Sequence, residues 1–596
     1  MKKNTFRKGL VVGIIILFVG ASIIPSMGGV AVEKHSSTDD RTPFMTFNHR
    51  GDTLYVGGSG PNNYTRIQDA IDNASDGDTI FVFNDSSPYV EHIIVNKSIA
   101  LIGEDSNSTT IDGSNESEVV VQILADGVSI REFTIRNYGE EAIDVLSNNT
   151  HISNNNIGPD LSGFSGYGIR LYQSNGNIIS DNLISNTFTG INILYSSDNV
   201  ISSNIMYSNW LGGIRLSGST NNTISENTIS SGTFAHALSY TGIDLVDSNN
   251  NVVSSNTIVS EFDDFYDNSY SGLYLWDSSD NTIIDNTLVK CGFQWYGLYQ
   301  NILEGNTING KPLVYLLGES DKVIDYAGQI ILIQCDSITI ENTEISNTQI
   351  AIELLETHNC IITGNTLTNN WRGVCLEYSD NNIISENMFS NNRYSVNLRE
   401  ESSHIVVSNN IIQNSAIGIS GSTGYNIIEE NIISNNGQGI KILGIFSPKN
   451  SITSNIITNN WNGLVLTYSY FNTISNNIIA NNTNGVYLDD HGNRNSIFSN
   501  IIKNNTNGMN LSYSNFNSIK RNNFIENERH ACFDTAFRNH WLSNYWEGDI
   551  LPPARIDGMI SFYKTDYWGN IIWELHIPWV NFDWNPAQEP YDIPAV

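Results

Sequence analysis

The sequence predicts an all-β chain that winds into a right-handed, single-stranded parallel β-helix with three strands in each turn. The first observation is a repeat of about 22 residues that opens on Gly-Ile-x-Leu or a close variant, as at residues 168–171 and 190–193. The second is the pattern within a repeat, where short apolar pairs alternate with polar residues between breaks of Asn, Ser, Asp and Gly. The third is that the repeat lacks the Leu-x-x-Leu-x-Leu frame of a leucine-rich repeat. Further copies open at Gly213, Gly242, Gly272, Gly373, Gly418, Gly439, Gly463, Gly485 and Gly508.

The N-terminal residues predict a leader and a linker ahead of the repeats. Basic residues at the start of the chain precede an apolar run at residues 9–24, which Pro25 ends. This pattern is typical of a secretory signal, expected over residues 1–31, and it predicts a secreted or cell-surface protein. A signal anchor that stays in the membrane is the alternative, because the run is close to the minimum length of a membrane span. Residues 32–50 are polar and unpatterned and are expected to be a linker.

The composition is strongly acidic, with 62 Asp and Glu against 29 Lys and Arg and a formal charge of −33. Such a chain repels phosphate backbones, so no nucleic-acid partner is expected. An acidic surface suits an extracellular protein, and membrane contact is expected only through the N-terminal signal or anchor. The five cysteines are too few and too scattered for a disulfide framework.

The β-helix itself is expected over residues 51–530, with an N-terminal cap at about 60–80. Ile67, Ala70 and Ile71 recur at helical spacing and predict a short amphipathic helix. Such a helix would cover the open end of the first turn, where exposed strand edges otherwise invite aggregation.

Two later regions depart from the repeat. Its register blurs around residues 310–315, which predicts an insertion over about 304–340. Residues 531–596 are rich in Trp and Pro, and we expect a C-terminal cap whose aromatic side chains cover the last turn.

Asparagine recurs at one position of the repeat and predicts a column of corner residues. Asn tolerates the left-handed backbone angles of tight corners. Its amide can also hydrogen-bond to the Asn of the next turn, which would form a ladder along the axis. The column consists of Asn182, Asn204, Asn227, Asn256, Asn286, Asn365, Asn387, Asn431, Asn455 and Asn500.

Several motifs carry a resemblance to a known family, and they extend over roughly residues 53–550. They are Ile67-Gln68-Asp69-Ala70-Ile71, Gly77-Asp78-Thr79-Ile80, Lys97-Ser98-Ile99, Ile111-Asp112-Gly113, Asn309-Gly310-Lys311-Pro312 and the Asn/Ile repeats. The chain resembles the pectin-lyase-like right-handed β-helices. Within them it is similar to the NosD-like group, also described as the carbohydrate-binding and sugar-hydrolysis (CASH) domain, of archaeal-type secreted surface proteins. This scaffold hosts lyases, hydrolases, epimerases, adhesins and binding proteins, so the resemblance implies a fold and not one activity.

The residue between Ile and Leu of each Gly-Ile-x-Leu is expected to point outward and to stack with its counterparts into a surface column. From Asp144 to Trp276 this face mixes acids, arginines and aromatic residues. Arginine pairs with uronate carboxylates and acids accept hydroxyl hydrogen bonds, while aromatic rings stack on sugars. The resemblance implies the same face, because it carries the polysaccharide groove in the family's enzymes. The predicted polysaccharide-binding residues are Asp144, Arg170, Tyr172, Asn192, Arg215, Asp244, Tyr274 and Trp276.

Catalysis on this face would need particular partners. A glycoside hydrolase needs two carboxyl groups about 5–10 Å apart, for which Asp244 with Asp263 or Asp264 is the candidate. A lyase or epimerase needs a cation that neutralises a substrate carboxylate, for which Arg215 is the candidate. The alternative is that these residues form ordinary solvated cross-strand pairs.

Calcium is the one cofactor that the sequence suggests, and copper is not expected. Carboxylates in a loop can bind Ca²⁺, although an acidic loop can equally be only solvated. Copper would need clustered His, Met or Cys, and these residues are scattered along the chain. The candidate calcium ligands are Glu261, Asp263, Asp264 and Asp267.

Three functions therefore remain open for the chain. The favoured one is a secreted or cell-surface protein that binds a polysaccharide or surface glycan through the outward column. The alternatives are a polysaccharide lyase, hydrolase or epimerase that uses the same face, and a structural or adhesive surface protein without catalysis.

Overall fold

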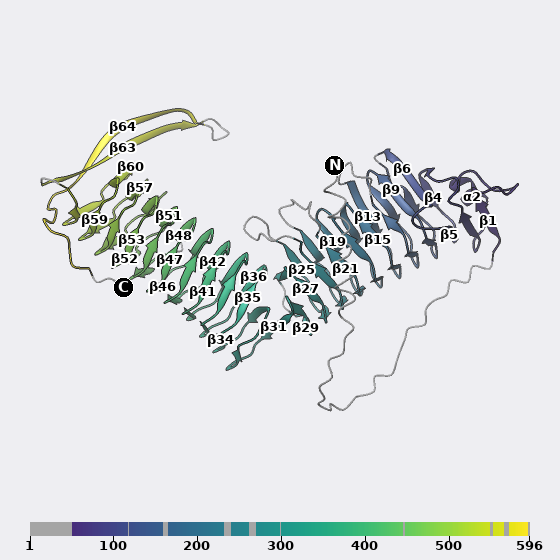
Figure 1. Cartoon of the computed structure of the whole chain (residues 1–596), viewed down its shortest axis with the longest axis horizontal. Helices are drawn as coiled ribbons and strands as arrows, with labels where there is room; N and C mark the ends of the chain where they lie inside the picture. The colour runs from purple at the N-terminus through teal and green to yellow at the C-terminus, as the bar shows by residue number, and fades with distance from the viewer. Residues whose placement is uncertain are drawn as a thin grey trace, which may run out of the picture. The chain divides into compact units, whose positions relative to one another are not determined.

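The computed structural model describes residues 51–596 except 117, 159–164, 232–239, 262–269, 298–299, 445–447, 549–551, 566–570 and 594–596. The predicted signal at residues 1–31 and linker at 32–50 lie outside these residues. Within them, the chain forms 64 strands and one short helix, α2 (Ile67–Asn73). Nearly every strand pairs in parallel with the equivalent strand of the next turn, as Figure 1 shows. The predicted parallel β-helix is confirmed.

Up to residue 308, three parallel sheets make up the solenoid. One sheet has eleven strands, from β1 (Thr53–Val56) to β29 (Ile302–Glu304), and another begins at β3 (Tyr89–Val90) and ends at β30 (Thr307–Ile308). The third, the nine-stranded sheet, contains the Gly-Ile-x-Leu segments. Its strands are β4 (Ile93–Val95), β7 (Val121–Ile123), β10 (Glu141–Val145), β13 (Ser165–Tyr172), β16 (Thr187–Leu194), β19 (Gly212–Ser217), β22 (Thr241–Val246), β25 (Ser271–Trp276) and β28 (Gly292–Tyr296).

The apolar residues of each turn point inward and meet their counterparts on neighbouring turns. In the nine-stranded sheet, Ile169, Ile191 and Ile214 lie in register on consecutive strands and are fully buried or nearly so. Burial of these side chains is the main force that holds the turns together. The side chain between each inward pair is then directed to the opposite face of its strand.

The predicted asparagine ladder is present. Asn455 is fully buried, and its Nδ2 donates to Oδ1 of Asn477 at 3.0 Å and to the carbonyl oxygens of Ile428 and Thr453. Its Oδ1 in turn accepts hydrogen bonds from the backbone N–H and the side-chain amide of Asn431. The same pattern recurs at the other predicted positions, so these asparagines satisfy the polar backbone groups of buried corners.

The expected short helix covers the first turn. Ile67, Ala70 and Ile71 are its buried residues. Glu91 from the turn above accepts hydrogen bonds from the first backbone N–H groups, with 2.8 Å from Ile67 N to Oε1. Lys97 Nζ donates to three carbonyl oxygens at the other end, including that of Ala74 at 2.7 Å. A carboxylate at the N-terminus and an ammonium at the C-terminus both complement the polar groups that a helix leaves unpaired.

At the predicted insertion, the chain reverses direction and starts a second solenoid segment. Strand β30 pairs antiparallel with β31 (Lys311–Leu317), which pairs in parallel with β33 (Gln329–Ile333). All five residues of β33 are buried. Ile331 and Ile333 belong to the core of the first segment, whereas Ile330 and Leu332 belong to the core of the second. A single strand is therefore shared by two hydrophobic cores.

The side chain of Gln329 closes the edge of the nine-stranded sheet. Its Oε1 accepts from Phe293 N at 2.8 Å, and its Nε2 donates to Phe293 O at 2.7 Å. Gln329 is fully buried. The primary amide thus supplies both hydrogen bonds that the next strand would make, so β28 leaves no unpaired backbone group at this position.

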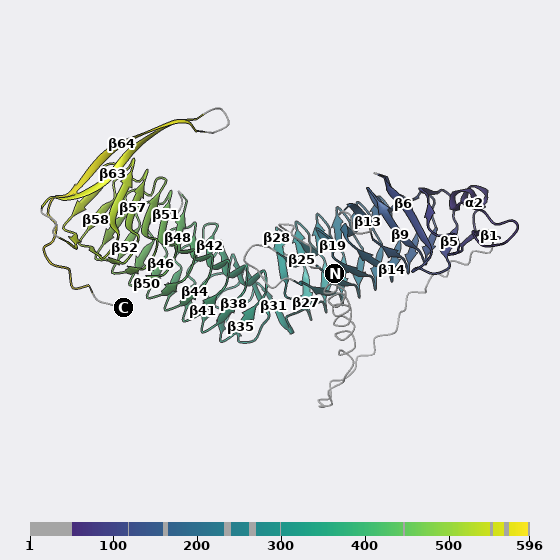
Figure 2. The same ribbon diagram turned by 45° about the horizontal axis from the view of Figure 1, so that its top comes forward.

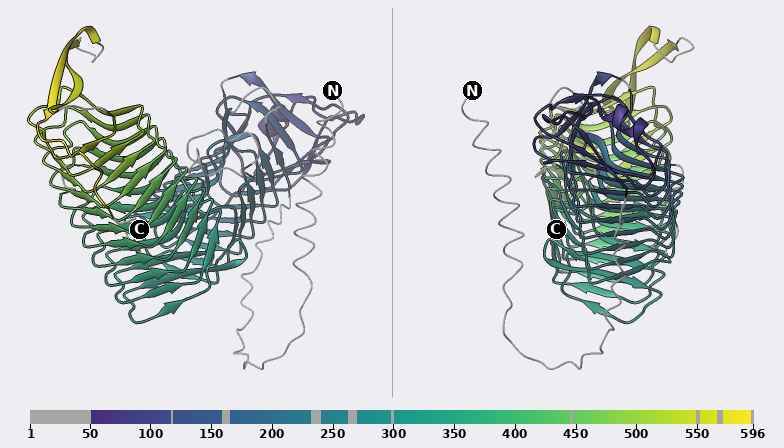
Figure 3. Two further views of the ribbon diagram at one scale, coloured as in Figure 1. Left: turned by 60° about the vertical axis from the view of Figure 1, so that its left-hand side comes forward. Right: turned by 90° about the vertical axis from the view of Figure 1, so that its right-hand side faces the viewer.

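The regular turns continue past residue 530, where a cap was expected to begin. Strands β60 (Arg529–Asp534), β61 (His540–Leu542) and β62 (Tyr545–Trp546) pair with the preceding turn in the usual register. Then β63 (Ala554–Thr565) and β64 (Ile571–Asp583) form a long antiparallel hairpin, drawn in yellow in Figures 2 and 3.

The expectation that the C-terminal aromatic residues cover the last turn holds only in part. Trp541 and Trp546 are buried, and the Trp546 ring stacks on Phe524 at 4.4 Å. Trp579 and Trp584 are instead 50% and 71% exposed, although Trp579 pairs with Gly558, where the hairpin meets β60. Trp568 lies outside the described residues.

The end of the asparagine ladder is closed by a carboxylate from β64. Asp583 is fully buried and accepts hydrogen bonds from the backbone N–H and side-chain amide of Asn544, at 2.9 and 3.0 Å. It also accepts from Nε1 of Trp546 at 3.2 Å. Asp583 therefore takes the place that the Asn of a further turn would occupy.

Candidate functional site

The predicted surface column exists as a register of side chains on consecutive strands of the nine-stranded sheet. Arg170, Asn192 and Arg215 are paired positions on β13, β16 and β19, as the repeat predicts. A second column follows two residues later and ends in Trp276 and Tyr296. In register order the first column reads Asp144, Arg170, Asn192, Arg215, Asp244, Tyr274 and Gln294, and the second reads Tyr172, Leu194, Ser217, Val246, Trp276 and Tyr296.

The first part of the column lies on the outer face of the sheet but is largely covered by neighbouring side chains. This corrects the expectation that all of its members face solvent. The side chain of Asp144 is only 1% exposed, because the guanidinium of Arg170 binds both of its oxygens, at 2.9 and 3.0 Å. Arg170 Nη1 also lies 2.8 Å from Glu141, whose side chain is 4% exposed. Asn192 is 2% exposed, and it lies between the longer side chains of Arg170 and Arg215. The charge of Arg170 is thus paired with two buried carboxyl groups of the same protein, those of Asp144 and Glu141.

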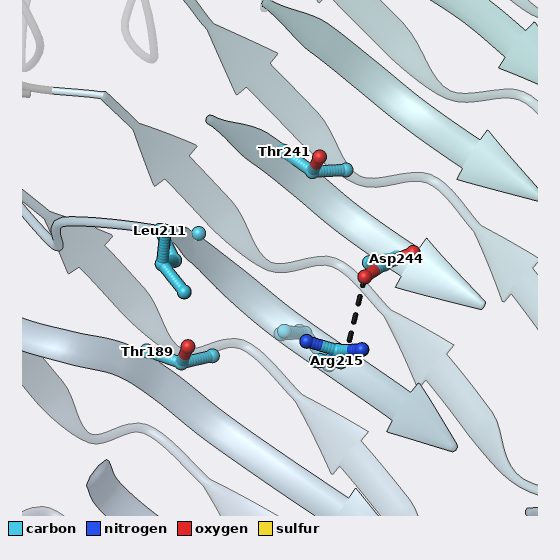
Figure 4. Close-up of a pocket in the computed structure, with 7 residues that line it drawn as sticks. Thr189, Leu211, Arg215, Thr241 and Asp244 are labelled. Atoms are coloured by element: carbon cyan, nitrogen blue, oxygen red, sulfur yellow. Dashed lines mark ion pairs between the residues drawn. The ribbon is translucent and has the colours of Figure 1, made fainter. Parts of the chain in front are cut away.

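Arg215 and Asp244 lie on adjacent turns and line a small open pocket (Figure 4). Arg215 Nε lies 3.5 Å from Asp244 Oδ2, which is longer than a good hydrogen bond, and the Arg215 side chain is 44% exposed. Asp244 Oδ1 is buried and has no hydrogen-bond partner among the described residues. The pocket volume is about 80 Å³, enough for a few waters or one substituent of a sugar ring. Its other lining residues are Thr189, Leu211, Gly212, Ile214 and Thr241.

The environment of the pocket shifts the protonation of its acid. Burial raises the pKa of Asp244 to about 6, and the charge of Arg215 opposes only part of that shift. Burial also raises the pKa of Tyr274 on the next turn to about 12. The Tyr274 hydroxyl therefore stays protonated at neutral pH and can donate a hydrogen bond.

We expect Asp244→Asn to stabilise the protein at neutral pH, by about 2 kcal/mol in the free energy of unfolding. The folded state of the parent holds the Asp244 proton up to pH 6, whereas the unfolded state releases it near its ordinary pKa of 3.8. The parent therefore loses this part of its stability as the pH rises through that window, and the asparagine variant does not. Denaturant unfolding at pH 3.5 and 7.5 checks this, because the two proteins should differ only at the higher pH. Equal stability at both values would contradict the buried, uncompensated state of Asp244.

Exposed aromatic rings continue the site on the following turns. Trp276 is 44% exposed and lies 5.0 Å, centroid to centroid, from Tyr296, which is 60% exposed. Tyr274 packs edge-on against Trp276 at 6.3 Å. At the other end of the second column, Tyr172 packs against Tyr195, and both are exposed. We call Tyr274, Trp276 and Tyr296 the aromatic shelf.

Tyr296 was not among the predicted site residues. Its strand β28 reads Gly-Phe-Gln-Trp-Tyr and lacks the Gly-Ile-x-Leu signature. Its place in the column follows from the pairing of Trp276 with Tyr296. The Gly that opens this segment was the one signal that could have found it.

The calcium prediction remains a prediction. Glu261 is described, and its Oε1 accepts a hydrogen bond from the hydroxyl of Ser230 at 2.7 Å. Asp263, Asp264 and Asp267 lie outside the described residues, so neither a calcium loop nor the proposed carboxyl partners of Asp244 can be placed. Among the residues that are described, no three His, Cys, Asp or Glu side chains come together as a metal-binding group.

Comparison with known proteins places the chain in a family. The sequence profile described as "Periplasmic copper-binding protein (NosD)" matches residues 71–288, 315–445 and 420–550. The chain belongs to the NosD family. The expected resemblance to this family is thereby confirmed. No curated protein sequence matches this NosD-family chain.

Among the described residues, two buried cysteines are poor ligands for the copper centre that the family description implies. Cu sites use clustered His, Cys or Met ligands. Cys291 and Cys375 are buried thiols whose pKa burial raises to about 12, which disfavours the thiolate that binds metals. The described residues bring no three His, Cys, Asp or Glu side chains together, and the copper binding named for the family is not carried over to this chain.

Solved structures with a detectable likeness include three enzymes at low identity. DFA-IIIase from Arthrobacter chlorophenolicus A6 is 10% identical over 61% of this chain and 94% of its own, with a TM-score of 0.33. Alginate lyase from Paenibacillus sp. str. FPU-7 is 14% identical over 43% and 99%, with a TM-score of 0.27. Pectin methylesterase PemA from Erwinia chrysanthemi is 12% identical over 43% and 89%, with a TM-score of 0.29. At these scores the likenesses carry no weight for the activity of this protein.

Proposed function

We propose that this NosD-family protein binds a polysaccharide through the Arg215–Asp244 pocket and the aromatic shelf. One observation carries the proposal: a buried carboxylate oxygen of Asp244 has no partner among the described residues, beside the open guanidinium of Arg215 and one turn from exposed Trp276. A few convergent polar groups beside aromatic surface are typical of ligand sites.

The chemistry of the site favours an acidic sugar. The pocket has room for one substituent, such as a carboxylate or a hydroxyl, while the rest of the ring would lie outside it. Arg215 can pair with a uronate carboxylate, and Asp244 can accept a hydrogen bond from a neighbouring hydroxyl. The exposed faces of Trp276 and Tyr296 can then stack on the next sugar rings along the chain.

We propose that the protein works outside the cytoplasm, as a secreted or cell-surface protein. The N-terminal sequence pattern and the acidic composition support this. The described part of the chain contains no helix with the length and apolar character that a membrane crossing requires.

Acid–base catalysis by Asp244 is the second candidate function, and one observation favours it. A pKa of about 6 suits proton transfer near neutral pH. A hydrolase would need a second carboxyl group about 5–10 Å away. A lyase or epimerase would instead use Arg215 to neutralise the substrate carboxylate.

Short uronate and neutral oligosaccharides of three or four sugars test both candidates. We expect calorimetry to show binding of the uronates, with hydrogen-exchange protection confined to β19, β22, β25 and β28. The Arg215→Ala, Trp276→Ala double variant should weaken this binding at least tenfold. Release of reducing ends or unsaturated uronates would show turnover and support the enzyme.

The matched control removes an exposed arginine and tryptophan elsewhere, as Arg521→Ala with Trp461→Ala, and it should bind like the parent. Unchanged affinity of the Arg215/Trp276 variant, or protection on other strands, would exclude this pocket. Neither binding nor products across the panel would leave a structural or adhesive role.

A further inference from the structure

One corner of the solenoid changes its chemistry along the chain while its backbone stays the same. At this corner, the residue directly before the stacked Asn or its equivalent has a left-handed backbone, with φ between 54° and 68°. Earlier turns place Asn149, Gly176, Asp198, Asn221, Asn250, Asp280, Asp321, Ser337, Asn359 and Asn381 there. The last seven turns place His404, Tyr425, Lys449, Phe471, Arg494, Phe516 and Arg538 there, which we call the corner ladder.

The residue types of the corner ladder are unfavourable for its backbone. Gly, Asn and Asp accept the left-handed region at low energetic cost, whereas bulky side chains are uncommon there. Nine of the ten earlier positions follow this preference, with Ser337 as the exception, whereas none of the last seven does. Bulky residues adopt the left-handed region at other corners too, as at Tyr195 and Tyr378, so the corner ladder is distinguished by the run of seven turns that carry them. A role for the exposed side chains themselves is therefore indicated.

The corner ladder alternates aromatic rings with cations on successive turns. Lys449 Nζ lies 5.1 Å from the Tyr425 ring centroid. The Arg494 guanidinium lies between two rings, 5.6 Å from Phe471 and 5.8 Å from Phe516. Arg538 lies 5.4 Å from the other side of Phe516.

The cations and aromatic rings of the corner ladder are accessible to solvent. All seven side chains are exposed, including Tyr425, Phe471 and Phe516 at about half of their surface. Among the described residues, neither Arg494, Arg538 nor Lys449 has an ion-pair partner, in a chain with a net charge of −33. Exposed cations without a carboxylate contact are available to complement an anionic partner.

We propose that the corner ladder is a second binding surface, which takes an extended acidic polysaccharide along the solenoid axis. Turns repeat at about 4.8 Å, so the cations recur at about 9.6 Å and the whole ladder spans about 29 Å. A linear polyuronate offers carboxylates at a regular spacing and sugar faces between them, which matches the alternation of cations and rings. This inference does not depend on the Arg215 pocket.

The experiment uses the full chain with the pocket already disabled by Arg215→Ala and Trp276→Ala. In that background, we expect polygalacturonate to bind with an affinity that falls as salt is added. Replacing Lys449, Arg494 and Arg538 together with Asn should weaken this binding at least tenfold. The substituted protein should fold, because Asn occupies the same corner in earlier turns. Oligomers of three or four sugars should bind far more weakly than the polymer, because they span only part of the ladder.

Two further variants and one further probe complete the design. Phe471→Asn with Phe516→Asn keeps every charge and should still weaken binding, because stacking is lost. Lys441→Gln, Lys503→Gln and Arg521→Asn remove the same charge elsewhere and should bind like the background protein. The proposal fails if polygalacturonate does not bind the background protein, or if the triple Asn variant binds as well as the control. Equal binding of single-stranded poly-dT would show a general polyanion surface and overturn the assignment to a glycan.

Discussion

Replacing Arg170 with alanine is expected to destabilise the protein by about 3–5 kcal/mol at pH 7.5, because it leaves two buried carboxylates without a counter-ion. Asp144 and Glu141 are 1% and 4% exposed at their side chains, and the guanidinium binds both within 3.0 Å. Even with Arg170 present, burial raises the pKa of Glu141 to about 7. Without it, both acids face the cost of an unpaired charge in a poorly solvated site.

The loss should depend on pH in a defined direction. An acid whose folded pKa is raised contributes its stability below the unfolded value and loses it as the pH rises through the folded value. Arg170→Ala should therefore be least harmful near pH 4 and most harmful above pH 7. Denaturant unfolding across that range is the measurement.

Two variants serve as controls for Arg170. Adding Asp144→Asn and Glu141→Gln to Arg170→Ala removes the charges and should recover most of the stability at pH 7.5. Arg215→Ala should cost clearly less than Arg170→Ala, because Arg215 is 44% exposed and lies 3.5 Å from one buried carboxylate, whereas Arg170 binds two within 3.0 Å. A loss for Arg170→Ala that stays constant from pH 4 to 8 would refute the account of buried charge.

Asn455→Ala is expected to cost at least about 3 kcal/mol, the second large effect. The change removes three donated and two accepted hydrogen bonds of a fully buried side chain. It leaves the backbone N–H of Asn431 and the carbonyl of Ile428 without that partner. In a solenoid the damage should spread mainly to the neighbouring turns.

Hydrogen exchange measures both the size and the spread of the Asn455 effect. Amides of the strands around Asn431, Asn455 and Asn477 should lose protection, while the segment before residue 308 should not. The control is Asn459→Gly in the same turn, an exposed corner residue at φ 57° whose backbone Gly adopts readily. Equal stability of the two variants would show that the asparagine ladder does not hold the turns together.

The repeat made much of the fold predictable. Glycine-led segments such as that at Gly190 fix the strand register, because a slip of one residue would turn Ile191 outward and Asn192 into the apolar core. The column of Asn residues likewise predicted stacked, hydrogen-bonded corners, and Asn455 shows that arrangement. Both predictions rest on interactions between positions at a constant spacing, which a sequence displays directly.

What sequence reasoning missed depends on contacts outside that spacing. Glu141 lies two residues before the repeat segment Ile143-Asp144-Val145, so its ion pair with Arg170 was not anticipated. The column was therefore expected to be more exposed than it is. The Gln329 side chain makes the hydrogen bonds of a further strand to Phe293, which lies 36 residues earlier in the sequence. No local sequence pattern predicts this contact. The corner ladder contradicts the local preference for Asn and Gly, so Phe471 and Arg494 were not recognised as equivalent positions.

The closure of the asparagine ladder by Asp583 has an electrostatic consequence. Along the second segment, each side-chain amide donates toward the following turn, so the amide dipoles point the same way and add up. Their sum leaves partial positive charge at the C-terminal end, as aligned peptide units do at the N-terminus of a helix. The carboxylate of Asp583 lies at that end, 3.0 Å from the last amide nitrogen. This column of amides is thus polarised along the axis, and a carboxyl oxygen of Asp583 accepts the hydrogen bonds at its positive end.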